Sequence, residues 1–298
     1  MKINLADKEY IFLIGYQREV KYRAAFDILA KKVFGISFEE WYQAGYWNEK
    51  YIPYTLFDGN KAVGNVSVNI MDFNTLGKPQ RYIQIGTVLT DENYRNKKLS
   101  RFLMEKVLEE WNDKSDFVYL YANPTALEMY PKFGFTRVKE YEYFRAINKN
   151  IEQHENFEKL NMDMQSNRAM LYDYAKNSSV FSKLSMRENA DLVMFYCISF
   201  FKENVYYIKA LDAIAVAKFN NNQLYLLDVF CKVEVELDTI INSLINSRID
   251  EVVLGFTPKD ISSYKPREIV EADALFIQKN KTILFDKNKL MFPLLSHA

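Results

Sequence analysis

The chain has few of the residues that build metal centres and disulfide frameworks. It contains two cysteines, Cys197 and Cys231, and two histidines, His154 and His297, with no CxxC or HxxxH spacing among them. A zinc site would need all four side chains to converge, so we expect no metal. Each cysteine stands in an apolar run, which is typical of a buried, reduced thiol.

An excess of charge of one sign and long apolar runs are also missing. The 39 basic residues balance 39 acidic residues, so the net charge gives no reason to expect nucleic acid or an anionic membrane as partner. No window approaches the roughly 18 apolar residues of a membrane span. The N-terminus lacks the apolar core of a secretory signal. We therefore expect a cytoplasmic protein in which any cationic site is local.

Glycine and proline are scarce, whereas aromatic residues are abundant. The chain has 9 Gly and 7 Pro against 21 Tyr and 22 Phe. This composition favours a core rich in strands, because aromatic side chains pack well on sheets. The alternative is an aromatic ligand site.

The most informative segment is residues 83–104, which read as a strand, a polar turn and an amphipathic helix. Leu99, Leu103, Val107 and Trp111 recur at four-residue spacing and predict a buried helix face. The first N–H groups of a helix have no internal partner and therefore bind anions. Basic residues flank this helix start, namely Arg95, Lys97, Lys98 and Arg101. The segment predicts a pyrophosphate site.

The other elements of the first half follow from periodicity and turn residues. A capping-box pattern at Ser37 and Glu40 marks the second helix, and Gly134 suits the left-handed end of the last one. Helices are predicted over 19–34, 37–44 and 125–132, and strands over 54–57, 61–72, 117–121 and 137–144. The strands that flank the 99–111 helix should be parallel.

The second half repeats this order after a polar segment. Residues 252–258 echo residues 118–124 in type and position. Strands are predicted over 205–211, 213–219, 223–230 and 251–256, a helix over 236–248, and a closing hairpin over 274–277 and 282–285. We expect an α/β protein with mixed sheets, divided into a domain over 1–146, a linker over 147–167 and a degenerate copy over 168–298. An unrelated α+β second domain is the alternative.

Two motifs resemble those of the GCN5-related N-acetyltransferase (GNAT) family. Tyr94–Ser100 is similar to the family's (Q/R)-x-x-G-x-(G/A) segment, and Asn123-Pro124 followed by Tyr130–Phe135 is similar to its second motif. The resemblance covers residues 1 to about 146. It implies tandem acyl-CoA N-acyltransferase-like domains, of which the second is degenerate.

The resemblance implies acetyl-CoA as cosubstrate and transfer of its acetyl group, by direct attack, to a primary amine of a small molecule or peptide. Tyr130 would protonate the leaving thiolate, and an amide near Val88 or Leu89 would stabilise the oxyanion. The residues implied in cofactor binding are Thr87, Val88, Leu89, Thr90, Arg95, Asn96, Lys97, Lys98, Leu99, Ser100, Arg101 and Asn123. If Tyr130 does not protonate the thiolate, its side chain only packs against its neighbours.

Lys98 and Ser100 depart from the motif, which has small residues at both places. Lys98 stands where glycine would allow close approach to phosphate. Either the charge of Lys98 strengthens phosphate binding, or its side chain crowds the phosphate site. The second outcome favours a non-catalytic protein that senses CoA or binds a partner.

The proton acceptor for the amine is open, because free alkyl amines have pKa values near 10.4 and the first half has no histidine. Asp72 at a strand end is one candidate, although it also fits a solvated acid. The terminal carboxylate of Ala298, presented by the apolar tail 291–295, is another, with His297 beside it.

An aromatic and acidic wall around residues 38–42 would suit a cationic amine, or it is an ordinary amphipathic helix. The second domain should close the acceptor site or form a subunit contact, so a homodimer is possible.

Overall fold

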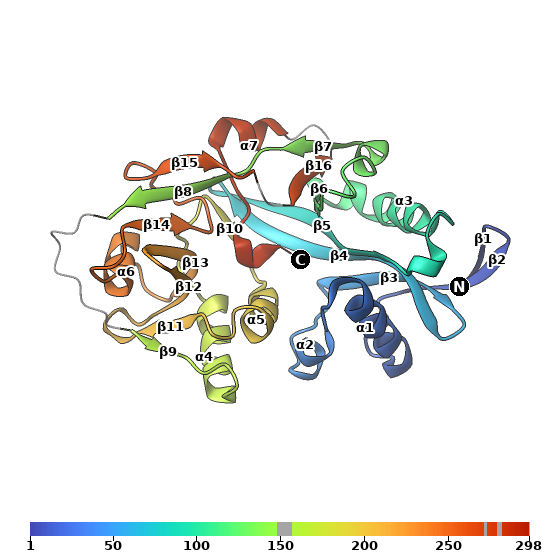
Figure 1. The fold of residues 1–298 in the computed structure, drawn as a ribbon, viewed down its shortest axis with the longest axis horizontal. Coiled ribbons are helices and arrows are strands. Elements are labelled where there is room, and N and C mark those ends of the chain that lie inside the picture. The colour runs from blue at the N-terminus through green and yellow to red at the C-terminus, as the bar shows by residue number, and fades with distance from the viewer. Residues whose placement is uncertain (148–156, 271–272, 279–281, 298) are drawn as a thin grey trace.

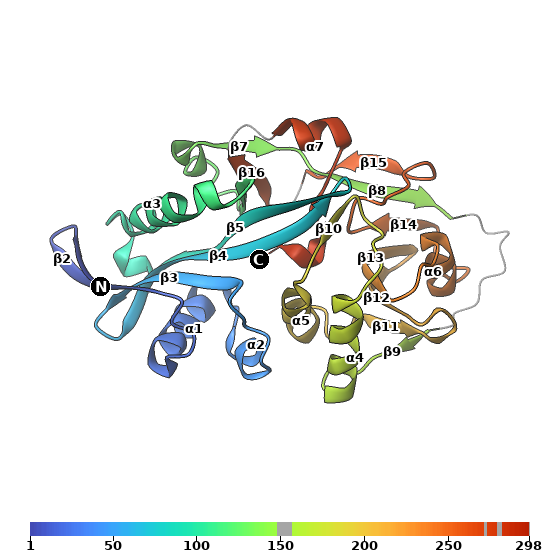
Figure 2. The ribbon, with the colours of Figure 1, turned by 180° about the vertical axis from the view of Figure 1, so that it is seen from behind.

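Two β-sheets lie side by side in a computed structural model of the chain (Figures 1 and 2), which describes residues 1–147, 157–270, 273–278 and 282–297. The mixed α/β class predicted from the sequence is confirmed. None of the helices in these ranges combines the length and the apolar character that a membrane crossing requires.

The first sheet has the strand order β1-β2-β3-β4-β5-β6-β16-β7, with β10 paired to β4. Its strands are β1 Lys2–Leu5, β2 Lys8–Ile14, β3 Tyr51–Asp58, β4 Lys61–Thr75, β5 Lys78–Thr90, β6 Phe117–Ala122, β7 Phe135–Val138, β10 Leu184–Met186 and β16 Ala274–Gln278. Antiparallel hairpins join β3 to β4 and β4 to β5, whereas β5 and β6 are parallel, as predicted.

The second sheet has the order β15-β8-β14-β13-β12-β11-β9. Its strands are β8 Tyr141–Ala146, β9 Glu158–Lys159, β11 Val205–Ile208, β12 Ala213–Asn220, β13 Gln223–Cys231, β14 Glu251–Leu254 and β15 Lys265–Glu268. The parallel pair β13 and β14 flanks a helix, as β5 and β6 do.

Helices cover the faces of the sheets and fill the space between them. Figure 1 shows α1 and α2 on one face of the first sheet and α3 on the other. The α-helices are α1 Val20–Phe34, α2 Glu39–Gln43, α3 Leu99–Trp111, α4 Gln165–Lys176, α5 Ala190–Ser199, α6 Leu237–Leu244 and α7 Thr282–Asn288. Short 3₁₀ helices are η1 Glu92–Tyr94, η2 Asn112–Lys114, η3 Tyr130–Phe133, η4 Lys209–Leu211 and η5 Leu294–Ser296.

The two halves of the chain exchange one strand each. β8, from the first half, lies between β14 and β15 and is antiparallel to both. β16, from the second half, lies between β6 and β7 and is antiparallel to both. Figure 1 shows green β8 among the strands of the second sheet and red β16 among those of the first. Each sheet therefore contains strands from both sides of the predicted linker, residues 147–167.

Most elements of the two halves correspond once the exchange is allowed for, whereas β1, β10 and α7 have no counterpart. The strands β2-β3-β4-β5-β6-β16-β7 match β9-β11-β12-β13-β14-β8-β15 in order and in the parallel or antiparallel sense of every pairing. The helices α1, α2 and α3 match α4, α5 and α6 in their place along the chain.

Several local predictions are wrong. Residues 125–129 form turns, and a helix begins only at Tyr130, as the 3₁₀ helix η3. The strand predicted over 137–144 is split into β7 and β8, which belong to different sheets. The second strand of the closing hairpin is helix α7, and its predicted turn, 279–281, lies outside the described residues. Gly134 does take the predicted left-handed conformation, with φ of 79°.

Candidate active site

A cleft opens in the first sheet where β5 and β6 separate. The two strands pair only from Tyr82–Ile85 to Phe117–Leu120, although β5 continues to Thr90. A bulge in β5 causes the divergence, since Thr87 has φ of 50° and its carbonyl oxygen accepts a hydrogen bond from Asn65 Nδ2 at 2.9 Å. Bulges bend a strand away from its neighbour. Backbone groups beyond Ile85 therefore face open space instead of β6.

A cavity of about 1710 Å³ occupies this cleft. Its lining includes Leu99 and Tyr130, from the apolar cluster beneath α3, and Phe38 and Tyr51, from the cluster beneath α1 and α2. Because these clusters cover opposite faces of the sheet, the cavity runs through the sheet at the gap between β5 and β6.

The α3 end of the cavity is built to receive anions. Among the described residues, no acceptor bonds the backbone N–H groups of residues 96–101. Lys97 and Arg101 are engaged locally, by Asn93 and Glu105. Arg95 and Lys98 form no ion pair within the described part of the chain, and both line the cavity. Amides and cations placed in this way at a helix start favour the binding of an anion such as phosphate.

Asn123 and Tyr130 lie on the opposite lip of the cleft. The Asn123 side-chain oxygen accepts hydrogen bonds from the N–H of Thr125 at 3.0 Å and its hydroxyl at 2.7 Å, which fixes the side chain. Tyr130 is buried, and its hydroxyl donates to no group in the described ranges. Burial, and secondarily the charge of Asp273, raises the pKa of Tyr130 to about 12. The hydroxyl therefore stays protonated at neutral pH.

Comparisons with known proteins identify this part of the chain. Residues 16–138 match the family model of the acetyltransferase (GNAT) domain. Residues 16–138 are a GNAT domain. The segment ends at β7 and holds the cleft, the α3 end and Tyr130. This match supports acyl-CoA-dependent N-acetyltransferase activity in general terms.

Solved structures resemble the whole chain at low sequence identity. They include a probable N-acyltransferase from Enterococcus faecalis V583 (TM-score 0.55, 11% identity, covering 92% of this chain and 74% of that one). Eis1 from Mycobacterium abscessus has TM-score 0.56 and 12% identity, covering 90% of this chain and 73% of its own. A GCN5-related N-acetyltransferase from Kribbella flavida has TM-score 0.52 and 13% identity, covering 90% and 71%. These likenesses show a shared fold. No curated protein matches the chain.

Most residues that the sequence assigned to cofactor binding line the cavity of the GNAT domain. They are Thr87, Val88, Thr90, Arg95, Asn96, Lys98, Leu99, Ser100 and Asn123. Leu89 instead has its side chain buried in the core beneath α1. Lys97 and Arg101 lie beside the loop without lining the cavity.

Lys98 adopts the backbone conformation that explains the family's glycine. It is the N-cap of α3 and has φ of 61° and ψ of 16°, in the left-handed region. A side chain there costs about 1 kcal/mol, whereas glycine is unstrained. Lys98 therefore keeps the loop's shape at an energetic cost and places a charge beside the amides at the start of α3.

Lys98→Gly is expected to raise the free energy of unfolding by about 1 kcal/mol, and Lys98→Ala to leave it within about 0.5 kcal/mol of the parent. Both variants lose the charge, so both should bind acetyl-CoA equally and more weakly than the parent. Urea denaturation and calorimetric titration measure the two effects. Equal stability of the glycine and alanine variants contradicts the strain.

The candidate base Asp72 lies away from the cavity, on β4. Its carboxylate pairs with Arg81 at 2.7 Å and with Lys50 at 3.3 Å. Partial burial acts to raise the pKa of Asp72, but the hydrogen bond from Arg81 and the two positive charges hold it below its usual value. A paired carboxylate outside the cavity is not placed to accept a proton from the amine. Ala298, the other candidate, lies outside the described residues.

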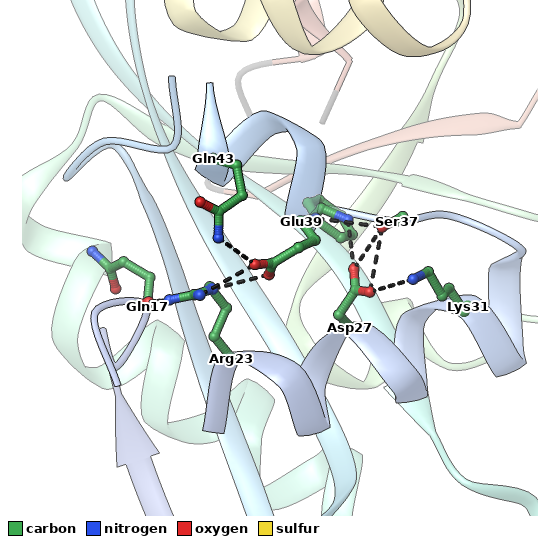
Figure 3. Close-up of polar contacts among 8 residues, drawn as sticks. Gln17, Arg23, Asp27, Lys31, Ser37, Glu39 and Gln43 are labelled. Carbon is green, nitrogen blue, oxygen red and sulfur yellow. Dashed lines mark hydrogen bonds and ion pairs between the residues drawn. The ribbon is translucent and has the colours of Figure 1, made fainter. Parts of the chain in front are cut away.

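The acidic half of the predicted acceptor wall is turned away from the cavity. Glu39 accepts hydrogen bonds from Arg23 and Gln43 (Figure 3), which lower its pKa, and Glu40 pairs with Arg168 at 2.9 Å. The capping box does not form, because α2 begins at Glu39 with Phe38 as its N-cap. The Ser37 hydroxyl instead donates to Asp27 and accepts a bond from the Glu39 N–H at 3.4 Å.

The aromatic half of the predicted wall does line the cavity. The backbone N–H of Phe38 donates to Asp27 at 2.7 Å, which holds Phe38 at the cavity beside Trp41.

Helix α5, which periodicity did not reveal, supplies the facing wall from the second half. Phe195 stacks on Phe38 with ring centroids 5.3 Å apart, and Trp41 Nε1 donates to the carbonyl oxygen of Asp191 at 2.7 Å. Leu192 and Tyr196 also line the cavity. The second half therefore supplies one wall of the cavity, as expected if it closes the acceptor site. Helix α5 was missed because nearly all its residues are apolar and give no helical stripe.

The C-terminal tail enters the same space. Phe292 stacks on Tyr119 with ring centroids 4.1 Å apart, and His297 stacks on Tyr121 at 4.1 Å. Burial lowers the pKa of His297 to about 4, so its ring is neutral at neutral pH. The predicted docking of the apolar tail is confirmed.

Sequence reasoning missed Glu140, a buried carboxylate in the cavity wall between β7 and β8. Its Oε1 accepts hydrogen bonds from the Tyr121 hydroxyl at 2.9 Å and from the Phe292 N–H at 2.8 Å. Burial raises the pKa of Glu140 to about 7 despite these two bonds. In the sequence, Glu140 follows Val138 and Lys139 and looks like an exposed acidic residue of a strand. No local pattern therefore indicates that it is buried.

Proposed function

We propose that the protein transfers acetyl from acetyl-CoA to a primary amine of a small molecule or peptide by direct attack. The observation that carries the proposal is a single cavity that joins the free amides at the start of α3, the Tyr130 hydroxyl and an aromatic pocket on the other face of the sheet. Such a path brings a donor and an acceptor together from opposite sides of the sheet.

Each end of the path has a role in this mechanism. Arg95, Lys98 and the amides of residues 96–101 hold the pyrophosphate, and the open edge of β5 at 86–88 pairs with the pantetheine arm. The amide of Val88 faces the carbonyl oxygen of the thioester and stabilises its developing charge. Asn123 contacts the arm from the opposite lip. Tyr130 donates its proton to the departing thiolate.

We further propose that residues 168–298 are a degenerate second copy of the fold without a cofactor site. The match of seven strands and three helices in order and pairing sense supports duplication. The ladder between β13 and β14 is extended by a bond from the Gly255 N–H to Leu226, 2.7 Å long. A Cβ at Gly255 would meet the carbonyl oxygen of Leu227 at 2.8 Å, so the backbones stay in contact where the first sheet opens.

Titration with acetyl-CoA, followed by an assay of thiol release over a panel of amines, tests the function. Arg95→Ala should weaken acetyl-CoA binding about tenfold, because a charged hydrogen bond to phosphate is lost. Lys106→Ala removes a charge further along α3, where Lys106 pairs with Glu109, and should leave binding unchanged.

Two results contradict parts of the proposal. Binding without thiol release from any amine favours the alternative of a non-catalytic CoA sensor, for which the strained Lys98 is the supporting observation. Absence of binding excludes both the enzyme and the sensor.

A further inference from the structure

The acceptor end of the cavity is unusually apolar for a site that receives an amine. Six of the side chains that form it are Phe38, Trp41, Tyr51, Phe195, Tyr196 and Leu294. They come from α2 and its flanks, α5 and the tail, so both halves of the chain contribute. A surface of this kind binds an apolar or aromatic body through burial of its area and ring stacking.

Negative charge in the cavity is confined to two places. Among the described residues that line it, the acids are Glu140 and Asp273. Asp273 lies near Tyr130, whose pKa its charge raises. Glu140 hydrogen-bonds Tyr121, whose ring stacks on the tail residue His297. A ligand with several positive charges would therefore leave some of them unpaired against apolar walls, which is costly.

Glu140 has one oxygen to offer to a ligand. The side chain is 8% exposed, and both hydrogen bonds that it accepts from described residues are to Oε1. Oε2 accepts no hydrogen bond from the described residues. Since it is also absent from the set of fully buried atoms without a partner, Oε2 keeps some accessible surface. Since Glu140 lines the cavity, Oε2 is its open atom.

We propose that the acceptor is a primary amine with one positive charge on an aromatic or apolar body, and that Oε2 of Glu140 receives its ammonium group. This inference rests on the proposed acetyl transfer. The surrounding rings add cation–π attraction for a single cation. Lys218, the one lysine on the acceptor side of the described lining, lies over the Phe201 ring at 4.7 Å, which disfavours a second cation there.

Glu140 also provides an acceptor for the proton that the ammonium group must lose before the amine can attack. The ammonium gives one proton to Oε2, and the nitrogen lone pair then forms the C–N bond as the C–S bond breaks. Tyr130 protonates the thiolate and regains a proton from the nitrogen, directly or through water. Glu140 releases its proton to solvent. Its pKa of about 7 suits a group that must accept and release a proton near neutral pH.

The other titratable groups around Glu140 keep their charge state over the useful pH range. Tyr119 and Tyr121 on β6, and Tyr196 on α5, all have pKa values raised by burial. His297 on the tail has its pKa lowered to about 4. Asp228 on β13, near Cys197 of α5, also has its pKa raised by burial to about 7, but it does not line this cavity. Among Glu140 and the four neighbours named here, Glu140 is therefore the group that titrates between pH 5.5 and 9, and the Glu140 variant separates its inflection from that of Asp228.

A matched panel of amines tests the acceptor class. With saturating acetyl-CoA, 2-phenylethylamine and tryptamine should give kcat/KM at least about tenfold above 1,5-diaminopentane and spermidine, from the burial of one ring. Diamines that equal or exceed the aromatic amines overturn the inference and leave acetyl transfer standing. Thiol release from no amine at all overturns the proposed function as well.

Glu140→Gln tests the carboxylate with the best aromatic amine. The parent's kcat/KM should fall below pH 7 as Glu140 protonates, and the variant should lose this inflection and about tenfold of kcat/KM at pH 8. Acetyl-CoA affinity should not change. Glu268→Gln, which removes an exposed acid paired with Lys139, serves as control. An unchanged inflection in the Glu140 variant removes the assigned role.

Discussion

Replacing Tyr130 by phenylalanine is expected to lower kcat by about a hundred- to a thousandfold and to leave acetyl-CoA affinity unchanged. The hydroxyl lines the cavity but bonds no described residue, so its loss breaks no contact that supports the fold. The variant removes only the proton donor. Pre-steady-state thiol release and calorimetric titration measure the two quantities separately.

Tyr10→Phe is the matched control for this variant. Tyr10 is buried in the same apolar cluster, and its hydroxyl also has no hydrogen-bond partner among the described residues, but it does not line the cavity. Its replacement should leave kcat within about twofold. Because the pKa of Tyr130 is about 12, the acid should stay protonated up to pH 10, and activity should not decline below that pH through its ionisation. A Tyr130 variant with normal turnover shows that the tyrosine only packs.

Phe292→Ala is expected to lower the free energy of unfolding by about 3–5 kcal/mol, the usual cost of truncating a buried aromatic side chain. Phe292 is fully buried. Its ring lies 4.1 Å from Tyr119, 5.1 Å from Phe285 and 5.3 Å from Phe73. It therefore joins the tail to strands of the first sheet and to α7. Urea denaturation followed by circular dichroism measures the loss.

Ile283→Ala is the control in the same C-terminal segment. Ile283 is on α7 and is 71% exposed, so its truncation should change stability by less than about 0.5 kcal/mol. The Phe292 variant should also bind the aromatic amine more weakly, because the tail carries Leu294 and His297 into the cavity. Similar stabilities of the two variants show that the tail does not hold the sheet.

Local sequence patterns predicted the parts of the site that local chemistry determines. The β5–α3–β6 unit follows from apolar periodicity, and the anion site follows from the helix start and its basic flank. Lys98 was singled out by comparison with a glycine motif, and its left-handed φ of 61° gives the reason for that glycine.

The features that the sequence did not reveal depend on contacts between distant segments. Sequence patterns predict strands over 137–144 and 274–277, but they carry no information about which strand each will pair with. Glu140 is enclosed by distant segments, since Tyr121 of β6 and Phe292 of the tail both donate to it. Glu39 and Glu40 leave the cavity because Arg23 and Arg168 are nearby to pair with them. Pairing partners of this kind are set by tertiary structure.

The strand exchange has a consequence for synthesis on the ribosome. The gap between β6 and β7 is filled by β16, so the GNAT sheet stays open until residue 278 has left the exit tunnel. At usual elongation rates, the wait after β7 is roughly ten to thirty seconds. During that time two strand edges can pair with another nascent chain. The two halves of the protein must therefore reach their native state together, because neither sheet is complete without a strand from the other half.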